Sequence, residues 1–178
     1  MNIGKDIIAK PSSAFTAEKS ISLSGMYELT KPRLSLLSVF TASLGYLVYD
    51  PFRSDISVFM CLTIGTALSA AGSAVLNQWM ERKEDALMSR TKDRPLPAKI
   101  VTPSTAFIFG SSLCVLGIFV LWTGTNPWAA MLTLSTIVIY LFLYTPLKKK
   151  TSWAIEIGAV SGALPPLVGW VAAADSPT

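Results

Sequence analysis

Apolar residues fill five long stretches of the chain, and polar or charged residues cluster between them. No charged residue occurs among the 25 positions 56–80, the 48 positions 100–147 or the 18 positions 157–174. A helix that crosses a bilayer core needs about 20 mostly apolar residues, so these stretches are long enough to span. The pattern predicts an all-α, polytopic bundle of transmembrane helices over residues 34–49, 56–76, 104–123, 128–144 and 153–173.

Small residues and prolines add detail to these predicted spans. Residues 124–127, Gly-Thr-Asn-Pro, predict a tight turn between the third span and the fourth. Pro165 and Pro166 lie inside the fifth span, and together they predict a kink or an unwound turn that faces protein or a cavity. Close helix packing is favoured by small residues on the second and fifth spans, namely Gly65, Ser69, Gly72, Ser73, Gly158, Ser161 and Gly162.

Composition supports a membrane protein and excludes several other classes. The chain is 51% hydrophobic and only 15% charged, with a mean hydropathy of +0.49, whereas a soluble domain has about 25% charged residues. These 178 residues contain no histidine, which excludes imidazole metal sites and Ser-His-Asp triads among them. Cys61 and Cys114 lie in apolar stretches and are expected to be reduced packing residues.

The basic residues predict the orientation of the bundle. Five Lys or Arg precede the first span, one follows it, six follow the second span, none follows the third, and three follow the fourth. A cytoplasmic N-terminus places 14 of these residues inside and 1 outside, as the positive-inside rule requires. Residues 1–30 are then a cytoplasmic tail with one short helix near residues 21–29, and a bacterial inner membrane is favoured over a mitochondrial one.

The segment after the second span holds the candidate chemistry. If the second helix continues into this segment, Asn77, Glu81 and Asp85 follow each other at intervals of four residues and project from one face. Two carboxylates and an amide oxygen are hard ligands of the kind that suits Mg²⁺, whose coordination shell is often completed by substrate phosphates. The spacing therefore predicts a magnesium site at the membrane surface.

Three basic residues, Arg90, Lys92 and Arg94, follow shortly after and suit phosphate oxygens. Carboxylates for a metal, bases for phosphate and a neighbouring apolar bundle together favour a lipid diphosphate as substrate. The spacing alone leaves open a solvated loop whose basic residues only set the topology. Nucleic acid is disfavoured, because acids alternate with the bases and only Trp79 is available to stack on a base.

Several segments resemble the UbiA-type intramembrane prenyltransferases, and more narrowly the heme O synthase (protoheme IX farnesyltransferase) family. Residues 77–85 are similar to the first aspartate-rich motif of those enzymes. The more specific matches are Arg-Thr-x-x-Arg-Pro at residues 90–95 and Gly-Ala-Leu-Pro-Pro at residues 162–166. The other similar segments are residues 28–35, 74–81 and 144–148.

The resemblance implies farnesyl transfer from farnesyl diphosphate to a vinyl group of heme B, which gives heme O. It implies that Asn77, Glu81 and Asp85 hold Mg²⁺ against the diphosphate and that Arg94 stabilises the leaving group. Arg90 and Lys92 would support Arg94, so the catalytic residues it implies are Asp85, Glu81 and Arg94.

Four more residues have two interpretations each. Lys31 and Arg33 are expected to be interface anchors rather than part of the site. Tyr140 and Tyr144 either face the cavity or belong to the interfacial aromatic belt.

The chain departs from the family in length. The family has about nine spans and a second aspartate-rich motif, whereas only Glu156 and Asp175 are acidic after residue 93. We therefore expect residues 31–178 to be an incomplete prenyltransferase domain, inactive alone, whose missing part is the C-terminal half; a heme A synthase is a further candidate partner. Alternative functions are prenyl transfer to an aromatic or quinone precursor, and a non-enzymatic membrane scaffold or channel subunit.

Overall fold

The computed structural model describes residues 22–49 and 55–174, and within these residues it is all-α, as the hydropathy pattern predicts. The helices in order are α1 (Leu23–Leu29), α2 (Pro32–Tyr49), α3 (Ile56–Asp85), α4 (Pro103–Gly124), α5 (Pro127–Val138), the π-helix η1 (Ile139–Tyr144), α6 (Thr145–Leu147) and α7 (Ala154–Ala173). The short helix predicted near residues 21–29 is thus α1. The rest of the N-terminal tail lies outside the described residues.

Four stretches are long and apolar enough to cross a membrane: α3, α4, the continuous stretch Pro127–Leu147 and α7. They confirm four of the five predicted spans. The helix α2 forms where the first span is predicted, but its 18 residues are not among those four. Its place as a span stays a prediction.

Polar side chains and prolines define the ends of the long helices. The Thr102 hydroxyl accepts from the backbone N–H of Thr105 at 3.1 Å, and Pro103 fills the first position of α4. Asn126 Oδ1 accepts from the backbone N–H of Ala129 at 2.9 Å, and Pro127 opens α5. Side-chain caps of this kind satisfy the free N–H groups of a first helical turn. The tight turn predicted at residues 124–127 is confirmed.

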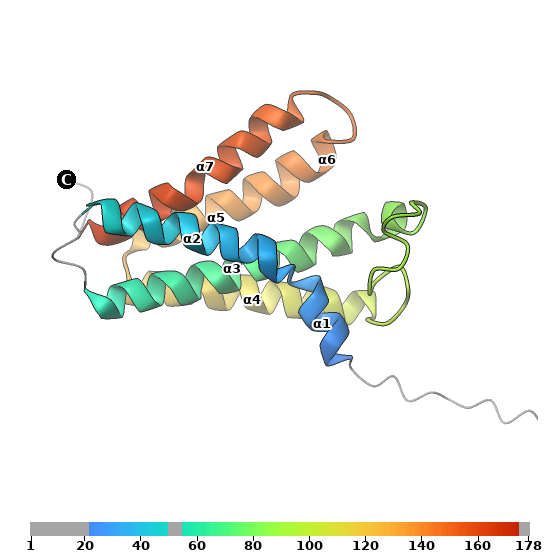
Figure 1. The fold of residues 1–178 in the computed structure, drawn as a ribbon, viewed down its shortest axis with the longest axis horizontal. Helices are drawn as coiled ribbons and strands as arrows, with labels where there is room; N and C mark the ends of the chain where they lie inside the picture. The colour runs from blue at the N-terminus through green and yellow to red at the C-terminus, as the bar shows by residue number, and fades with distance from the viewer. Residues whose placement is uncertain (1–21, 50–54, 175–178) are drawn as a thin grey trace, which may run out of the picture.

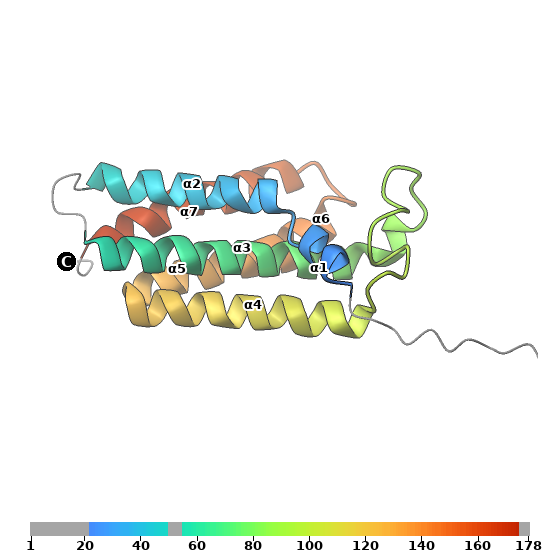
Figure 2. The same cartoon turned by 60° about the horizontal axis from the view of Figure 1, so that its bottom comes forward.

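The five long helical stretches contact one another in a closed ring. Around the bundle, α3 packs on α4, α4 on α5, α5 on α7, α7 on α2, and α2 on α3. Figures 1 and 2 show α3 between α2 and α4, with α7 beside α2. The same views place α1, residues 86–102 and the α6–α7 connection at one end of the bundle. The charged segments predicted to share one side of the membrane therefore share one end of the fold.

Glycines allow the backbones of neighbouring helices to approach closely. A Cβ on Gly72 in α3 would lie 2.7 Å from the Gly110 carbonyl oxygen in α4, so the predicted close packing of the second span is confirmed. A Cβ on Gly169 in α7 would lie 1.8 Å from the Ala42 carbonyl oxygen in α2. The prediction is wrong for Gly162, because no other atom lies within 4 Å of its added Cβ. Both cysteines are free, as expected.

The prolines of α7 do not unwind it. The helix runs from Ala154 to Ala173 through Pro165 and Pro166, so of the predicted kink or unwound turn the unwound turn is wrong, while the kink stays a prediction. Each proline removes one N–H donor, which leaves the carbonyls four residues earlier, at Ser161 and Gly162, without their helical partners. Both of these residues line the central cavity. An unpaired carbonyl is tolerated at membrane depth where it faces a cavity, and this part of the prediction agrees with the structure.

Candidate active site

One face of α3 carries the predicted metal ligands. The helix continues past its apolar part and ends at Asp85, so Asn77, Glu81 and Asp85 lie on successive turns, as the four-residue spacing requires. Their exposed fractions are 1%, 7% and 6%. Burial of two carboxylates is unfavourable unless each is paired with a cation or hydrogen-bonded. The partners of these acids are therefore informative.

Each buried carboxylate has a cationic partner from a different part of the chain. Arg94 Nη1 lies 2.7 Å from Asp85 Oδ2, and Lys148 Nζ lies 2.8 Å from Glu81 Oε1. A third pair, Lys149 with Glu84 at 2.7 Å, is more exposed. The contact between Arg94 and Asp85 agrees with the sequence, whereas the role of Lys148 was missed. The only signal for it was that residues 144–148 match the family.

The segment that carries Arg94 is fixed by its own contacts. The Thr91 hydroxyl donates to the Asp85 backbone carbonyl at 2.9 Å. Leu96 and Val101 are buried against Leu29 and Val75. These anchors hold the turn-rich residues 86–102 over the end of α3. The other two predicted phosphate ligands, Arg90 and Lys92, are exposed and make no ion pair within the described residues. The structure thus brings one of the three predicted bases to the acids.

Lys31 belongs to the charged cluster that Glu81, Asp85, Arg94 and Lys148 form. It connects α1 to α2 with a φ of 46°, in the left-handed region that a residue with a Cβ rarely adopts. Its side chain lines the central cavity. The pKa of Lys31 is lowered, first by burial and then by the repulsion of Arg94. The attraction of Glu81 and Asp85 opposes this shift but does not cancel it. The structure therefore favours a place in the site for Lys31 over the expected role of interface anchor.

Gln78 holds the segment with Lys31 against α3. Its Nε2 donates to the Leu29 carbonyl at the end of α1 at 2.7 Å. Both residues are buried, Leu29 completely. This contact joins two segments 49 residues apart, which is why the sequence did not predict it.

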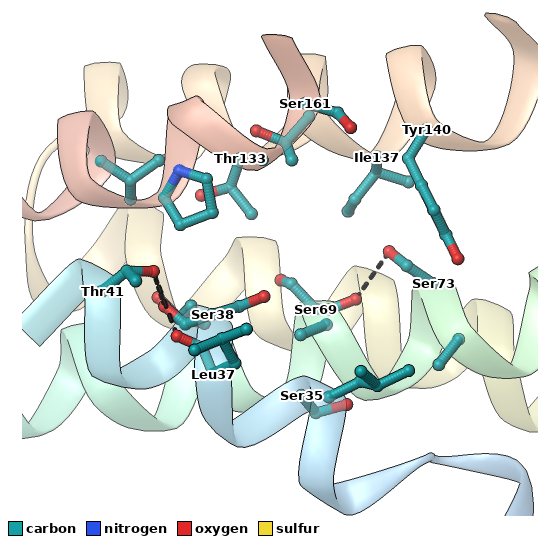
Figure 3. Close-up of a pocket in the computed structure, with 18 of the residues that line it drawn as sticks. Ser35, Leu37, Ser38, Thr41, Ser69, Ser73, Thr133, Ile137, Tyr140 and Ser161 are labelled. Atoms are coloured by element: carbon teal, nitrogen blue, oxygen red, sulfur yellow. Dashed lines mark hydrogen bonds between the residues drawn. The ribbon is translucent and has the colours of Figure 1, made fainter. Parts of the chain in front are cut away.

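Behind the charged cluster lies a cavity of about 360 Å³ between α2, α3, α5, η1 and α7. Ten of its lining residues carry a hydroxyl. Figure 3 shows Thr133 and Ser161 across the cavity from Ser38. Five of these hydroxyls donate to carbonyls of their own helices, whereas the buried Thr66 and Ser69 hydroxyls have no hydrogen-bond partner within the described residues. The cavity surface is thus mostly carbon, with hydroxyl groups as its weakly polar sites.

Two tyrosines stand between the cavity and the acids. Tyr140 lines the cavity, and its ring stacks on that of Tyr144 with a centroid distance of 5.6 Å. Lys148 Nζ lies 5.4 Å from the centre of the Tyr144 ring, within the range of a cation–π contact. Of the two interpretations left open, the structure supports a position facing the cavity for Tyr140, whereas that of Tyr144, which is not among the lining residues, stays open.

The donor set of α3 suits a hard divalent cation. It offers two carboxylates and one amide, and Mg²⁺ characteristically takes one or two carboxylates with water and phosphate oxygens. No group of three or more acidic, cysteine or histidine side chains is gathered among residues 22–49 and 55–174. These residues can therefore supply part of a coordination shell but do not form a complete cage.

Known proteins resemble this chain over most of its length. Residues 38–178 match the UbiA prenyltransferase family. A protoheme IX farnesyltransferase of Opitutus terrae is 48% identical over 157 residues, which cover 88% of this chain and 53% of that protein. One from Solibacter usitatus is 41% identical over 160 residues, covering 85% and 55%. A mitochondrial one from Candida glabrata is 35% identical over 166 residues, covering 93% and 37%.

The matches cover most of this chain but only part of each relative. The chain spans about half the length of the two bacterial relatives. No solved structure matches it. The family match covers well over half of the chain and includes the carboxylates of α3, residues 86–102 and the prolines of α7. The chain belongs to the UbiA prenyltransferase family.

Proposed function

We propose that this chain carries part of the active site of an enzyme that transfers a farnesyl group from farnesyl diphosphate to heme B, giving heme O. The observation that carries the proposal is the buried row Asn77, Glu81 and Asp85, which begins one helical turn after the cavity-lining Ser73 and has Arg94 and Lys148 on its acids. The names of the relatives, protoheme IX farnesyltransferases, support the choice of substrates.

The charged end of the site would bind the diphosphate. Asn77, Glu81 and Asp85 would hold Mg²⁺, which when bound neutralises negative charge on the phosphates. Arg94, Lys31 and Lys148 would contact phosphate oxygens directly, and a planar guanidinium can do so with two parallel hydrogen bonds. Positive charge placed before the reaction stabilises the leaving diphosphate as the carbon–oxygen bond breaks.

The cavity would receive the farnesyl group. When the bond breaks, its electron pair leaves with the diphosphate and an allylic cation remains. The ring of Tyr140, which lines the cavity, would stabilise that cation, while the apolar walls exclude water from it. The vinyl π electrons of heme B then form the new carbon–carbon bond. Water adds to the cation that results and loses a proton, which gives the hydroxyethylfarnesyl group.

The rest of the setting is proposed on the same basis. The positive-inside count supports a cytoplasmic position for the charged end and the N-terminus, and the membrane would be a bacterial inner membrane. Since the relatives are about twice as long, the remaining ligands of the diphosphate would come from the part that these residues do not include. A heme A synthase is a candidate to accept the product.

The test compares three proteins in a bacterial strain that lacks heme O synthase. These are the 178-residue chain, a fusion of this chain to the C-terminal half of the Opitutus terrae relative, and the same fusion with Asp85→Asn. We expect extracted heme O only from the unaltered fusion, with a loss of about 100-fold in the variant, as for removal of a group that stabilises developing charge. Immunoblots of the membranes verify equal amounts.

Each other outcome has a definite meaning. Unchanged heme B with altered quinones would favour the aromatic or quinone acceptor. Equal heme O from the Asp85→Asn fusion would contradict the proposed site and favour a scaffold role for this chain. Heme O from the 178-residue chain alone would show that the cavity is complete without the C-terminal half.

A further inference from the structure

A buried chain of hydrogen bonds joins Asn77 to the π-helix η1. Asn77 Nδ2 donates to Thr145 Oγ1 at 2.9 Å, and Thr145 Oγ1 donates to the Tyr140 carbonyl oxygen at 2.8 Å. The exposed fractions of Asn77 and Thr145 are only 1% and 2%. The two side chains are 68 positions apart in the sequence. Neither partner is needed to cap a helix, so the contact requires another explanation.

The direction of these bonds fixes the orientation of the amide. A hydroxyl has a single hydrogen, and the Tyr140 carbonyl can only accept, so the Thr145 hydroxyl must donate to it. The Thr145 oxygen can then only accept, and Asn77 must turn its NH₂ group toward it. If the amide flipped, Oδ1 would face another acceptor. Asn77 Oδ1 is therefore held away from Thr145.

The π-helix makes this arrangement possible. In an α-helix a threonine hydroxyl characteristically bonds to the carbonyl four residues earlier. Here both the N–H and the hydroxyl of Thr145 reach Tyr140, five residues earlier. The residue that contacts Asn77 is thus the one that directly follows the π-helix. Single π turns of this kind are frequent at functional sites.

We propose that Thr145 is a positioning residue that orients Asn77 so that its amide oxygen, rather than its nitrogen, is available to a cation bound with Glu81 and Asp85. The inference rests on the proposed function, because it requires Asn77 to be a ligand. Thr145 itself contacts neither the cation nor the substrate. The oxygen and the NH₂ group of an amide are similar in shape, so Asn77 could turn either one toward the cation. Thr145 excludes the orientation in which the NH₂ group faces the cation.

The test compares the wild type with an Asn77→Asp background. The two oxygens of an aspartate carboxylate are equivalent, so this side chain needs no residue to orient it. Mn²⁺ binding in the presence of farnesyl diphosphate is measured by electron paramagnetic resonance in detergent micelles, on the fusion of this chain to the C-terminal half of the Opitutus terrae relative. Thr145→Val should weaken binding about tenfold, as is typical when the support of a metal ligand is lost. Thr145→Ser, which keeps the hydroxyl, should restore it to within about twofold. In an Asn77→Asp background, Thr145→Val should change binding less than about twofold.

Controls separate this inference from a loss of folding and from failure of the proposed function. Thr123→Val removes a similar hydroxyl, which donates to the Phe119 carbonyl at 2.9 Å far from the site, and should not alter Mn²⁺ binding. Equal losses for Thr145→Val in both backgrounds, or no loss in either, would overturn the positioning role. If Asn77→Ala binds Mn²⁺ as well as the wild type, the proposed metal site itself fails.

Discussion

Replacing Gly169 by alanine tests the packing that closes the cavity. Gly169 lies in α7, and a Cβ added there would be 1.8 Å from the Ala42 carbonyl oxygen and 2.8 Å from the Tyr46 nitrogen in α2. Ordinary contact begins near 3.4 Å. All of these atoms belong to the backbone, so no side-chain rotation can relieve the overlap. The two helices must separate, or one of them must bend.

The cost follows from the rigidity of the contact. Overpacking in a well-packed core costs about 1–3 kcal/mol, and an obstacle made of backbone atoms favours the upper end of that range. Separation of α2 and α7 would also loosen the buried cluster of Ala42, Tyr46, Val168 and Ala172. We therefore expect Gly169→Ala to lower the free energy of unfolding by about 3 kcal/mol.

Gly162→Ala is a matched control on the same helix. An added Cβ there meets no atom within 4 Å, and alanine favours a helix over glycine by up to about 1 kcal/mol. Its stability should be equal to that of the wild type or slightly higher. The assay is unfolding in mixed detergent micelles, followed by tryptophan fluorescence. Equal stability of the two variants would refute the inference that backbone contact sets the spacing of α2 and α7.

Two further predictions concern the ion pairs of the site. Arg94→Gln leaves a buried carboxylate without its cation and should lower stability by about 1–3 kcal/mol, whereas Arg90→Gln, at an exposed position, should change it by less than about 0.5 kcal/mol. Lys148→Met should destabilise by a similar 1–3 kcal/mol. Lys149→Met breaks a more exposed pair and should cost at most about 1 kcal/mol. Denaturant unfolding measures the stability of all four variants. Equal losses for Arg94→Gln and Arg90→Gln, or for Lys148→Met and Lys149→Met, would contradict the assigned burial.

The row of ligands on α3 could be predicted because its geometry is local. Once a helix is assumed, the four-residue interval places Asn77, Glu81 and Asp85 on one face, whatever the rest of the fold does. The apolar stretches likewise set the positions of the long helices, since a bilayer leaves few alternatives to a helix. The turn at residues 124–127 was equally local. The structure confirms the turn, the four spans α3, α4, Pro127–Leu147 and α7, and the helix that carries Asn77, Glu81 and Asp85, whereas the ligand role of these three residues and the place of α2 as a span stay predictions.

The rest of the site depends on contacts between distant segments. Lys148 and Thr145 meet α3 only because the stretch Pro127–Leu147 packs beside it and changes to a π-helix at Ile139. Nothing in the hydropathy pattern predicts that change. Lys31 was taken for an interface anchor because a basic residue next to an apolar stretch is usually one. The unwound turn was wrong because α7 continues through both prolines, and the residues whose carbonyls lose their partners, Ser161 and Gly162, line the cavity.

The charges of the site indicate in which order its ligands bind. Lys31 interacts electrostatically with Arg94, Glu81, Lys148 and Asp85, so three bases and two acids lie close together. The free site has a positive excess, which attracts an anion and repels a bare divalent cation. Under the proposed function, the diphosphate should therefore bind first or together with Mg²⁺, since its negative charge offsets the bases. Mn²⁺ affinity should rise when farnesyl diphosphate is present, and an affinity that is independent of it would contradict this charge balance.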